Sequence, residues 1–268
     1  LDQEQAGTVA GTLTDAFVID AITANGVETI TIDTTFTSSV GNAEDITVTA
    51  LTSSTISTLN ITGTADLTIT GALDTDLDTL NASTSTGANS FTLNGGAVAV
   101  TGGSGADTVA FGTSYTTADS FDGGAGTDVM SATWSSGNNT PTGISNVETL
   151  ASTFTGGSLN ATNLSSVTTH RIVDQTANTS ITNLASTATT INQRGDGATA
   201  RANTFSYATS AAATVTYNNA SASEDLANAS TTFSNVANLT IAANDGSSSV
   251  DYDWDLASLA GGTALTDL

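Results

Sequence analysis

Two nine-residue segments decide the fold of this 268-residue chain: Gly102-Gly-Ser-Gly-Ala-Asp-Thr-Val-Ala110 and Gly123-Gly-Ala-Gly-Thr-Asp-Val-Met-Ser131. Both match the pattern G-G-x-G-x-D-x-U-x at every defined position, where U is a large apolar residue. Asp107 and Asp128 are 21 residues apart, about the length of one turn of a β-solenoid. The spacing therefore predicts that the two segments stack on one another in successive turns of a parallel β-solenoid.

The residue types in these loops suit a hard cation. Paired glycines let the backbone adopt left-handed or extended-positive dihedral angles that turn carbonyl oxygens inward, and the aspartate adds a carboxylate. Because Ca²⁺ takes about six to eight oxygens, more than one loop offers, two stacked loops are expected to share each ion. The candidate calcium-site residues, including the nearby acids that would complete or extend the site, are Gly102, Gly103, Ser104, Gly105, Asp107, Asp119, Asp122, Gly123, Gly124, Ala125, Gly126 and Asp128.

Short stretches of alternating apolar and polar residues recur along the whole chain. Examples are Glu28-Thr-Ile-Thr-Ile-Asp33, Asp66-Leu-Thr-Ile-Thr70 and Thr214-Val-Thr-Tyr217. Each places apolar side chains on one face and mostly threonine on the other, which is typical of a half-buried strand. Gly, Asn, Asp and Ser separate most of these stretches, and helical patterns are nearly absent. The sequence therefore predicts an all-β protein with strands of about four to six residues.

Imperfect internal repeats favour the solenoid over other all-β folds. Ser57-Thr-Leu-Asn-Ile-Thr-Gly63 and Ala65-Asp-Leu-Thr-Ile-Thr-Gly71 are variants of one unit, and Asn146-Val-Glu-Thr-Leu150 is echoed by Asn235-Val-Ala-Asn-Leu239. Stacked repeats bury a thin continuous core of small aliphatic side chains, which suits a chain with only 5% aromatic residues. An antiparallel β-sandwich is the alternative, because regularly spaced short strands also occur in that fold.

The position of the paired glycine-rich segments divides the chain into three regions. We expect an N-terminal β-rich repeat region over residues 1–100, a calcium-binding segment over 101–150 and a C-terminal β-rich repeat region over 151–268. The three regions are expected to form one continuous solenoid.

The charge composition excludes several classes of partner. Three Lys+Arg against 26 Asp+Glu give a formal net charge of −23. This excess repels nucleic-acid phosphates and anionic lipid, and no stretch approaches transmembrane length, so neither nucleic acid nor membrane insertion is expected. Without cysteine, disulfides, zinc–thiolate sites and thiol nucleophiles are excluded. The acids are 21 Asp and 5 Glu, a bias toward the residue typical of turns and calcium sites.

Two further acidic stretches are weaker candidates for ion sites, Asp74-Thr-Asp-Leu-Asp78 and Asp251-Tyr-Asp-Trp-Asp255. If either forms a strand, its three carboxylates share one face and repel one another without a cation. Such alternation is more often a solvated face or a loop.

No catalytic constellation is expected. His170 is the only histidine, and a strand over Thr168-Thr-His-Arg-Ile172 would place it on one face with Ile172. A packed or surface histidine is therefore expected rather than a catalytic base, and no nucleophile-elbow pattern accompanies it.

One part of the chain resembles a known family. The segment Gly123-Gly-Ala-Gly-Thr-Asp-Val-Met130, followed by Gly143-Ile-Ser-Asn-Val-Glu-Thr-Leu150, is similar to the GGxGTDxL…GφxNφExL module of RTX-type bacterial surface-layer proteins and hemolysin-type calcium-binding repeat proteins. The specific motifs cover about residues 102–150, and elsewhere the likeness is one of composition and strand texture. The resemblance implies type I secretion, folding outside the cell on binding Ca²⁺ and assembly into a surface lattice. Two nonapeptides do not imply a long calcium-filled β-roll.

We therefore expect a secreted, calcium-dependent structural protein, a subunit of a bacterial surface layer or a large portion of one. Its partners would be copies of itself in the lattice, joined by Ca²⁺ between acidic faces, and cell-surface polysaccharide. The alternatives are an RTX adhesin or ice-binding segment, and a non-catalytic calcium-binding module of a secreted enzyme. Ice binding would require regular threonine ranks, whereas Thr29/Thr31, Thr47/Thr49 and Thr68/Thr70 do not keep one period in the sequence. The enzyme module would require a catalytic domain that these residues do not contain.

Overall fold

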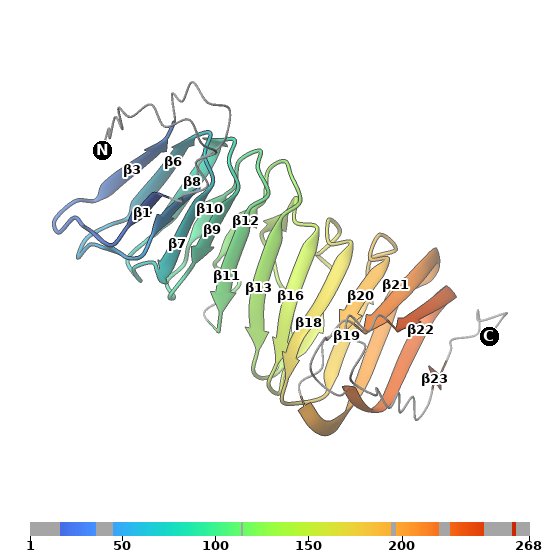
Figure 1. Cartoon of the computed structure of the whole chain (residues 1–268). Coiled ribbons are helices and arrows are strands. Elements are labelled where there is room, and N and C mark those ends of the chain that lie inside the picture. The colour runs from blue at the N-terminus through green and yellow to red at the C-terminus, as the bar shows by residue number, and fades with distance from the viewer. Residues whose placement is uncertain are drawn as a thin grey trace, which may run out of the picture.

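The chain coils into a parallel β-solenoid whose turns stack along one axis (Figure 1). The computed structural model describes residues 17–35, 45–113, 115–193, 197–219, 226–243 and 259–260. Within these ranges every regular element is a strand and every strand pairing is parallel, so the predicted fold is confirmed and the antiparallel sandwich is excluded. The same ranges hold no helix that could cross a membrane.

One wall, here called the first wall, runs through nearly the whole solenoid. Between β4 and β20 its register partners are 18 to 22 residues apart, which confirms that a spacing of 21 residues is one turn. Its strands are, in stacking order, β1 (Phe17–Ile19), β4 (Ile46–Val48), β7 (Leu67–Ala72), β9 (Asn89–Thr92), β11 (Thr108–Gly112), β13 (Val129–Trp134), β16 (Thr149–Phe154), β18 (Thr169–Gln175) and β20 (Thr190–Gln193).

A second wall accompanies the first wall through its N-terminal part. It consists of β3 (Thr29–Thr34), β6 (Thr58–Gly63), β8 (Thr79–Ser85), β10 (Ala99–Thr101), β12 (Ser120–Asp122) and β15 (Ile144–Ser145). The strand β10 spans the expected region boundary at residue 100, and β16 spans the one at residue 150. The strand ladders therefore continue across both boundaries.

A third side of the solenoid follows each first-wall strand along the chain. Its described strands form only one pair near the N-terminus and a continuous parallel ladder in the later turns. The early pair is β2 (Ile22–Thr23) with β5 (Leu51–Thr52), and the later ladder contains β14 (Asn138–Asn139), β17 (Ser158–Asn160) and β19 (Thr179–Leu184). The long strand β21 (Gly197–Asn219) pairs with β19 through its first part and with β20 through its last part. It is followed by β22 (Leu226–Ala243), which pairs with β21 and with β23 (Leu259–Ala260).

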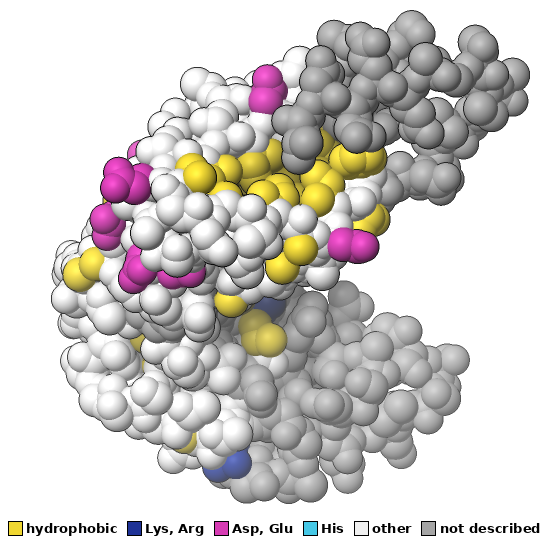
Figure 2. Space-filling view, turned by 90° about the vertical axis from the view of Figure 1, so that its left-hand side faces the viewer, with side chains coloured by type: hydrophobic (Ala, Val, Ile, Leu, Met, Phe, Trp, Pro, Cys, Tyr) yellow, Lys and Arg dark blue, Asp and Glu magenta, His cyan; other side chains and the backbone are white. Residues whose placement is uncertain are grey.

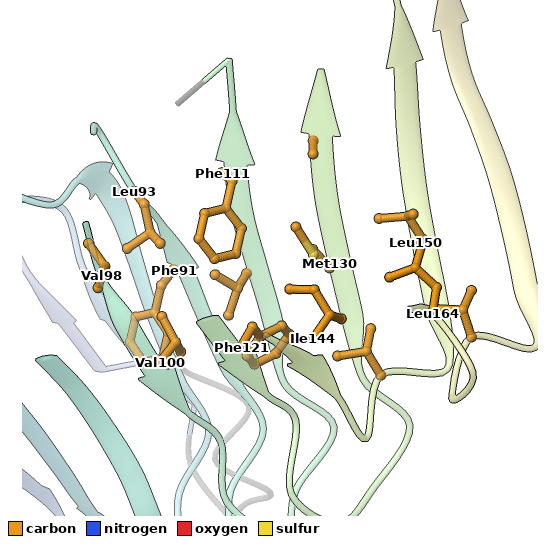
Figure 3. Close-up of a cluster of buried hydrophobic side chains, with 14 of the residues drawn as sticks. Phe91, Leu93, Val98, Val100, Phe111, Phe121, Met130, Ile144, Leu150 and Leu164 are labelled. Carbon is orange, nitrogen blue, oxygen red and sulfur yellow. The ribbon is translucent and has the colours of Figure 1, made fainter. Parts of the chain in front are cut away.

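The core is one continuous strip of side chains between the walls, from Ile46 to Val236. In Figure 3, Phe91 and Met130 project inward from the first wall, and Phe121 projects inward from the second. Six of the seven phenylalanines within the described ranges are buried, so aromatic side chains fill more of this core than their small number suggests. The outer surface in Figure 2 is largely white, the colour of uncharged polar side chains and backbone, because the alternate positions of each strand face solvent.

Candidate metal site

The two glycine-rich loops lie at one corner of the solenoid, where the second wall leads into the first. One loop joins β10 to β11, and the other joins β12 to β13. Thr108 pairs with Val129, so Asp107 stacks on Asp128, and the Asp107 N–H donates to Asp128 Oδ1 with an N···O distance of 2.7 Å. The predicted stacking of the two motifs is confirmed.

The first glycine of each motif is required because the turns approach closely. A β-carbon on Gly102 would lie 2.6 Å from Asp107 Oδ2 and would clash with the carbonyl oxygen of Gly123. A β-carbon on Gly123 would lie 2.5 Å from Asp128 Oδ2 and would clash with the carbonyl oxygen of Asn146 in the next turn. At both positions an aspartate oxygen and a carbonyl oxygen of the following turn therefore converge on the glycine.

The two loops differ in backbone conformation although their motifs are the same. Gly124 has a φ of 87°, whereas the equivalent Gly103 lies outside the positive-φ region. The Gly103 N–H donates to Asp107 Oδ2 at 2.7 Å, but the Gly124 N–H donates to Asp122 Oδ1 at 3.2 Å. The expectation that the glycines adopt left-handed or extended-positive angles holds in part for the second loop and is wrong for the first, where close approach is the reason for glycine.

The tips of the loops are also stacked. The exposed residues Ser104 and Ala125 donate their backbone N–H groups to the carbonyl oxygens of Ser85 (3.0 Å) and Gly103 (2.9 Å). A β-carbon on Gly126 would clash with the carbonyl oxygen of Gly105 directly beneath it. Hydrogen bonding between turns therefore continues from the walls into the loops.

Both carboxylate oxygens of Asp107 accept hydrogen bonds from protein donors. Its Oδ1 accepts hydrogen bonds from the backbone N–H and the side-chain Nδ2 of Asn89, both at 2.8 Å, and its Oδ2 accepts from Gly103 N–H. The side chain is only 2% exposed. Three N–H groups thus stabilise this buried charge without a cation.

The carboxylate of Asp128 is only half occupied. Its Oδ1 accepts from Asp107 N–H, while its buried Oδ2 has no hydrogen-bond partner. The side chain is 1% exposed. Burial, together with the neighbouring Asp107, Glu148 and Asp122 carboxylates, raises the pKa of Asp128 to about 6. An unpartnered buried oxygen of this kind is stabilised by a proton or by a cation.

The other two predicted acids lie at opposite ends of β12. Asp119 precedes the strand and accepts hydrogen bonds from Val98 N–H (2.9 Å) and Thr116 N–H (2.6 Å). Asp119 lies at the corner where the chain enters the second wall, and the structure does not bring it to the glycine-rich loops. Asp122 ends the strand beside the second loop, where its Oδ1 accepts from Asn146 Nδ2 at 2.7 Å.

Glu148 belongs to this corner although it was absent from the predicted site. Its Oε2 accepts a hydrogen bond from Asp128 N–H at 2.8 Å, as Asp66 Oδ1 does from Ala88 N–H at 2.7 Å. Asp45, Asp66, Asp107, Asp128 and Glu148 each directly precede a first-wall strand. The sequence signal that identifies Glu148 is therefore an acidic residue immediately before an alternating stretch.

The weaker candidates have different outcomes. Asp74 to Asp78 form a turn rather than a strand, in which Asp76 N–H donates to Asp74 Oδ1 at 3.0 Å and Leu77 is buried. Their carboxylates therefore do not share a strand face. The stretch Asp251 to Asp255 lies outside the described residues. His170 is buried in β18 on the same face as Ile172, as predicted.

The loop residues fit calcium only if backbone oxygens take part. Within the described ranges, no three acidic or histidine side chains stand close enough to hold a metal by themselves. The unpartnered Asp128 Oδ2 and the carbonyl oxygen of Asn146 are both hard oxygens that converge beside Gly123. Ca²⁺ accepts carboxylate and carbonyl oxygens together with water, so this donor set is compatible with it.

No protein-family model, curated protein or solved structure matches the chain. Its functional interpretation therefore depends on its own residues.

Proposed function

We propose that the chain is a secreted, calcium-dependent structural protein, a subunit of a bacterial surface layer or a large part of one. It would assemble with copies of itself into a lattice on the cell surface, attached to surface polysaccharide, and would have no enzymatic activity. The observation that carries this proposal is the stacked pair of GGxGxD loops with an unpartnered, buried Asp128 Oδ2.

Calcium at this corner would couple ion binding to folding. The Asp128 carboxylate is surrounded by Asp107, Asp122 and Glu148, which oppose its ionisation. A bound cation would remove this repulsion and join the second loop to the following turn. Because the unfolded chain has no such arrangement of oxygens, the free energy of ion binding would add to the free energy of folding.

The charge distribution supports calcium-mediated contacts between subunits. Seventeen of the 26 acidic residues precede Thr149, whereas all three arginines follow it. Figure 2 shows acidic side chains exposed at several places on the N-terminal end of the described solenoid. Two such surfaces repel one another unless cations lie between them, so the lattice is expected to require divalent ions.

Electron microscopy of the purified protein with Ca²⁺ and with excess chelator tests this function. We expect ordered arrays with Ca²⁺ and dispersed particles in chelator. The matched variants are Asp128→Asn, which should require more Ca²⁺ for assembly, and Asp66→Asn, which makes the same change in the same column and should behave as wild type. Arrays that persist unchanged in excess chelator would contradict the proposal.

A column of hydroxyl side chains supports a second candidate, an adhesin or ice-binding segment. The register of the first wall aligns Thr47 with Thr68 and Ser90, and Thr149 with Thr169 and Thr190, although their sequence spacings differ. These positions thus align in space although their spacings in the sequence differ, but Val129 interrupts the column between Thr108 and Thr149, and Thr149 itself is buried. The next outward position holds Ala110, Ser131 and Ala151, so the column is one residue wide there.

An ice-recrystallisation assay tests this second candidate. If the column orders water, the wild-type protein should inhibit recrystallisation and Thr169→Val, which keeps the side-chain shape, should inhibit it less. Equal crystal growth with and without the protein would exclude ice binding while leaving the surface-layer proposal unaffected.

A further inference from the structure

The two motif aspartates have unequal needs for a cation. Asp107 accepts three hydrogen bonds, one of them at Oδ2 from Gly103 N–H, so both of its oxygens already have protein partners. The equivalent donor in the second loop, Gly124 N–H, is turned toward Asp122. Asp128 Oδ2 is consequently the one carboxylate oxygen among the described residues that is both buried and without a partner.

The following turn supplies the second oxygen. Asn146 has a φ of 51°, a left-handed conformation that asparagine tolerates better than most residues. Its side-chain Nδ2 donates to Asp122 Oδ1, which fixes the residue, and its carbonyl oxygen points at Gly123 beside Asp128 Oδ2. Glu148, which lies in the same turn as Asn146, accepts a hydrogen bond from the Asp128 backbone N–H.

We propose that the site is asymmetric: one Ca²⁺ binds at the second loop through Asp128 Oδ2 and the Asn146 carbonyl oxygen, with water completing its coordination, whereas Asp107 binds no ion. This inference rests on the calcium dependence of the proposed function. It differs from the expectation that the two loops share an ion. Asp122 and Glu148 are positioning residues that hold Asn146 and Asp128, respectively.

Calorimetric titration of the purified chain with Ca²⁺ at about 0.15 M salt, where long-range charge effects are screened, tests the inference. We expect Asp128→Asn to lose one bound ion or at least about tenfold in affinity, because the site loses its charged ligand. Asp107→Asn should keep the ion with less than about a threefold change and should instead lower the melting temperature in chelator, because an N–H acceptor is lost. Asp66→Asn is the control for the charge change and should bind as wild type.

Asn146→Gly provides a second variant that keeps both the left-handed backbone and the carbonyl ligand. Loss of the hydrogen bond to Asp122 should lower Ca²⁺ affinity by about threefold, while far-UV circular dichroism remains that of the wild type. This variant keeps the test decisive if Asp128→Asn does not fold.

The outcomes separate this inference from the function on which it rests. Equal loss of affinity in Asp107→Asn and Asp128→Asn would overturn the asymmetric site and support a shared ion, while calcium dependence would stand. Loss in Asp107→Asn alone would also overturn the inference. A wild-type chain that binds no Ca²⁺ would contradict both this inference and the calcium dependence of the lattice.

Discussion

His170 lies in the first wall between Leu150 and Ile191, and it is 1% exposed. Its Nδ1 has no hydrogen-bond partner, and burial lowers the pKa of the imidazole to about 4. At the corner of the same wall, burial raises the pKa of Asp128 to about 6. The fold therefore favours the neutral form of each side chain. Lowering the pH destabilises the folded protein through His170, which must become charged, and stabilises it through Asp128, which loses its buried charge.

Replacing His170 by leucine tests the first of these effects. The unfolded histidine has a pKa of about 6.5, so the unfolded state binds the proton more readily, and stability falls as the pH decreases from about 6.5 toward 4. We expect this loss to reach about 3 kcal/mol at pH values near 4. Urea unfolding of His170→Leu should therefore lose less stability than the wild type between about pH 7 and pH 4.5. An identical pH dependence in both proteins would show that the pKa of His170 is the same in the folded and unfolded states.

Among the elements, the strands and the stacking of the loops could be predicted, whereas the contacts of individual polar groups could not. Alternation located strands such as Thr29–Thr34 and Leu67–Ala72, and the 21-residue motif spacing gave the turn length. The unpartnered oxygen of Asp128 depends on which N–H group each loop turns inward. Identical motifs differ in that respect, because their neighbouring turns differ.

A group of buried side-chain amides is a second example of polar contacts that could not be predicted from the sequence. Gln193 donates to Gln175, Gln175 donates to Asn203 and Asn203 donates to Gln193, with distances of 2.6, 3.1 and 3.2 Å. All three side chains are buried. Each residue alone looks suited to a surface position. None of the three is in register with another, since Gln193 pairs with Ile172 and Asn203 with Thr179, so the contacts depend on how the strand ends meet in the interior. Polar residues inside a solenoid therefore become predictable only after the three-dimensional fold is known.

Glycine substitutions in the loops test whether close stacking of the turns is required. We expect Gly123→Ala to destabilise the protein by about 3 kcal/mol or more, because the new methyl group meets backbone that cannot move without separating two turns. Gly112→Ala is the control: no atom lies within 4 Å of its β-carbon position, and its φ of 55° should cost about 1 kcal/mol. Thermal unfolding in chelator measures both variants. Equal losses would show that the close approach of the turns at Gly123 does not determine stability.

The whole molecule combines an unbroken parallel wall with an uneven distribution of charge. The part before Thr149 carries no basic residue, so its acids repel one another along the solenoid axis as well as within each turn. Such repulsion opposes the compact state, and both simple salt and a specific cation relieve it. The two effects differ in mechanism, since screening acts on every exposed acid whereas a bound ion acts on the buried Asp128.

Comparing NaCl, Mg²⁺ and Ca²⁺ separates screening from binding. Raising NaCl from about 0.1 M to about 1 M shortens the Debye length from about 10 Å to about 3 Å, so the melting temperature in chelator should rise in wild type and in Asp128→Asn alike. Millimolar Ca²⁺ at constant ionic strength should raise it further only where Asp128 is present. Mg²⁺ should be less effective, because its strict octahedral geometry suits an irregular set of carboxylate, carbonyl and water oxygens less well. If Mg²⁺ and Ca²⁺ stabilise both proteins equally, the divalent ions act by screening, and the acidic composition rather than the loop corner sets the ion dependence.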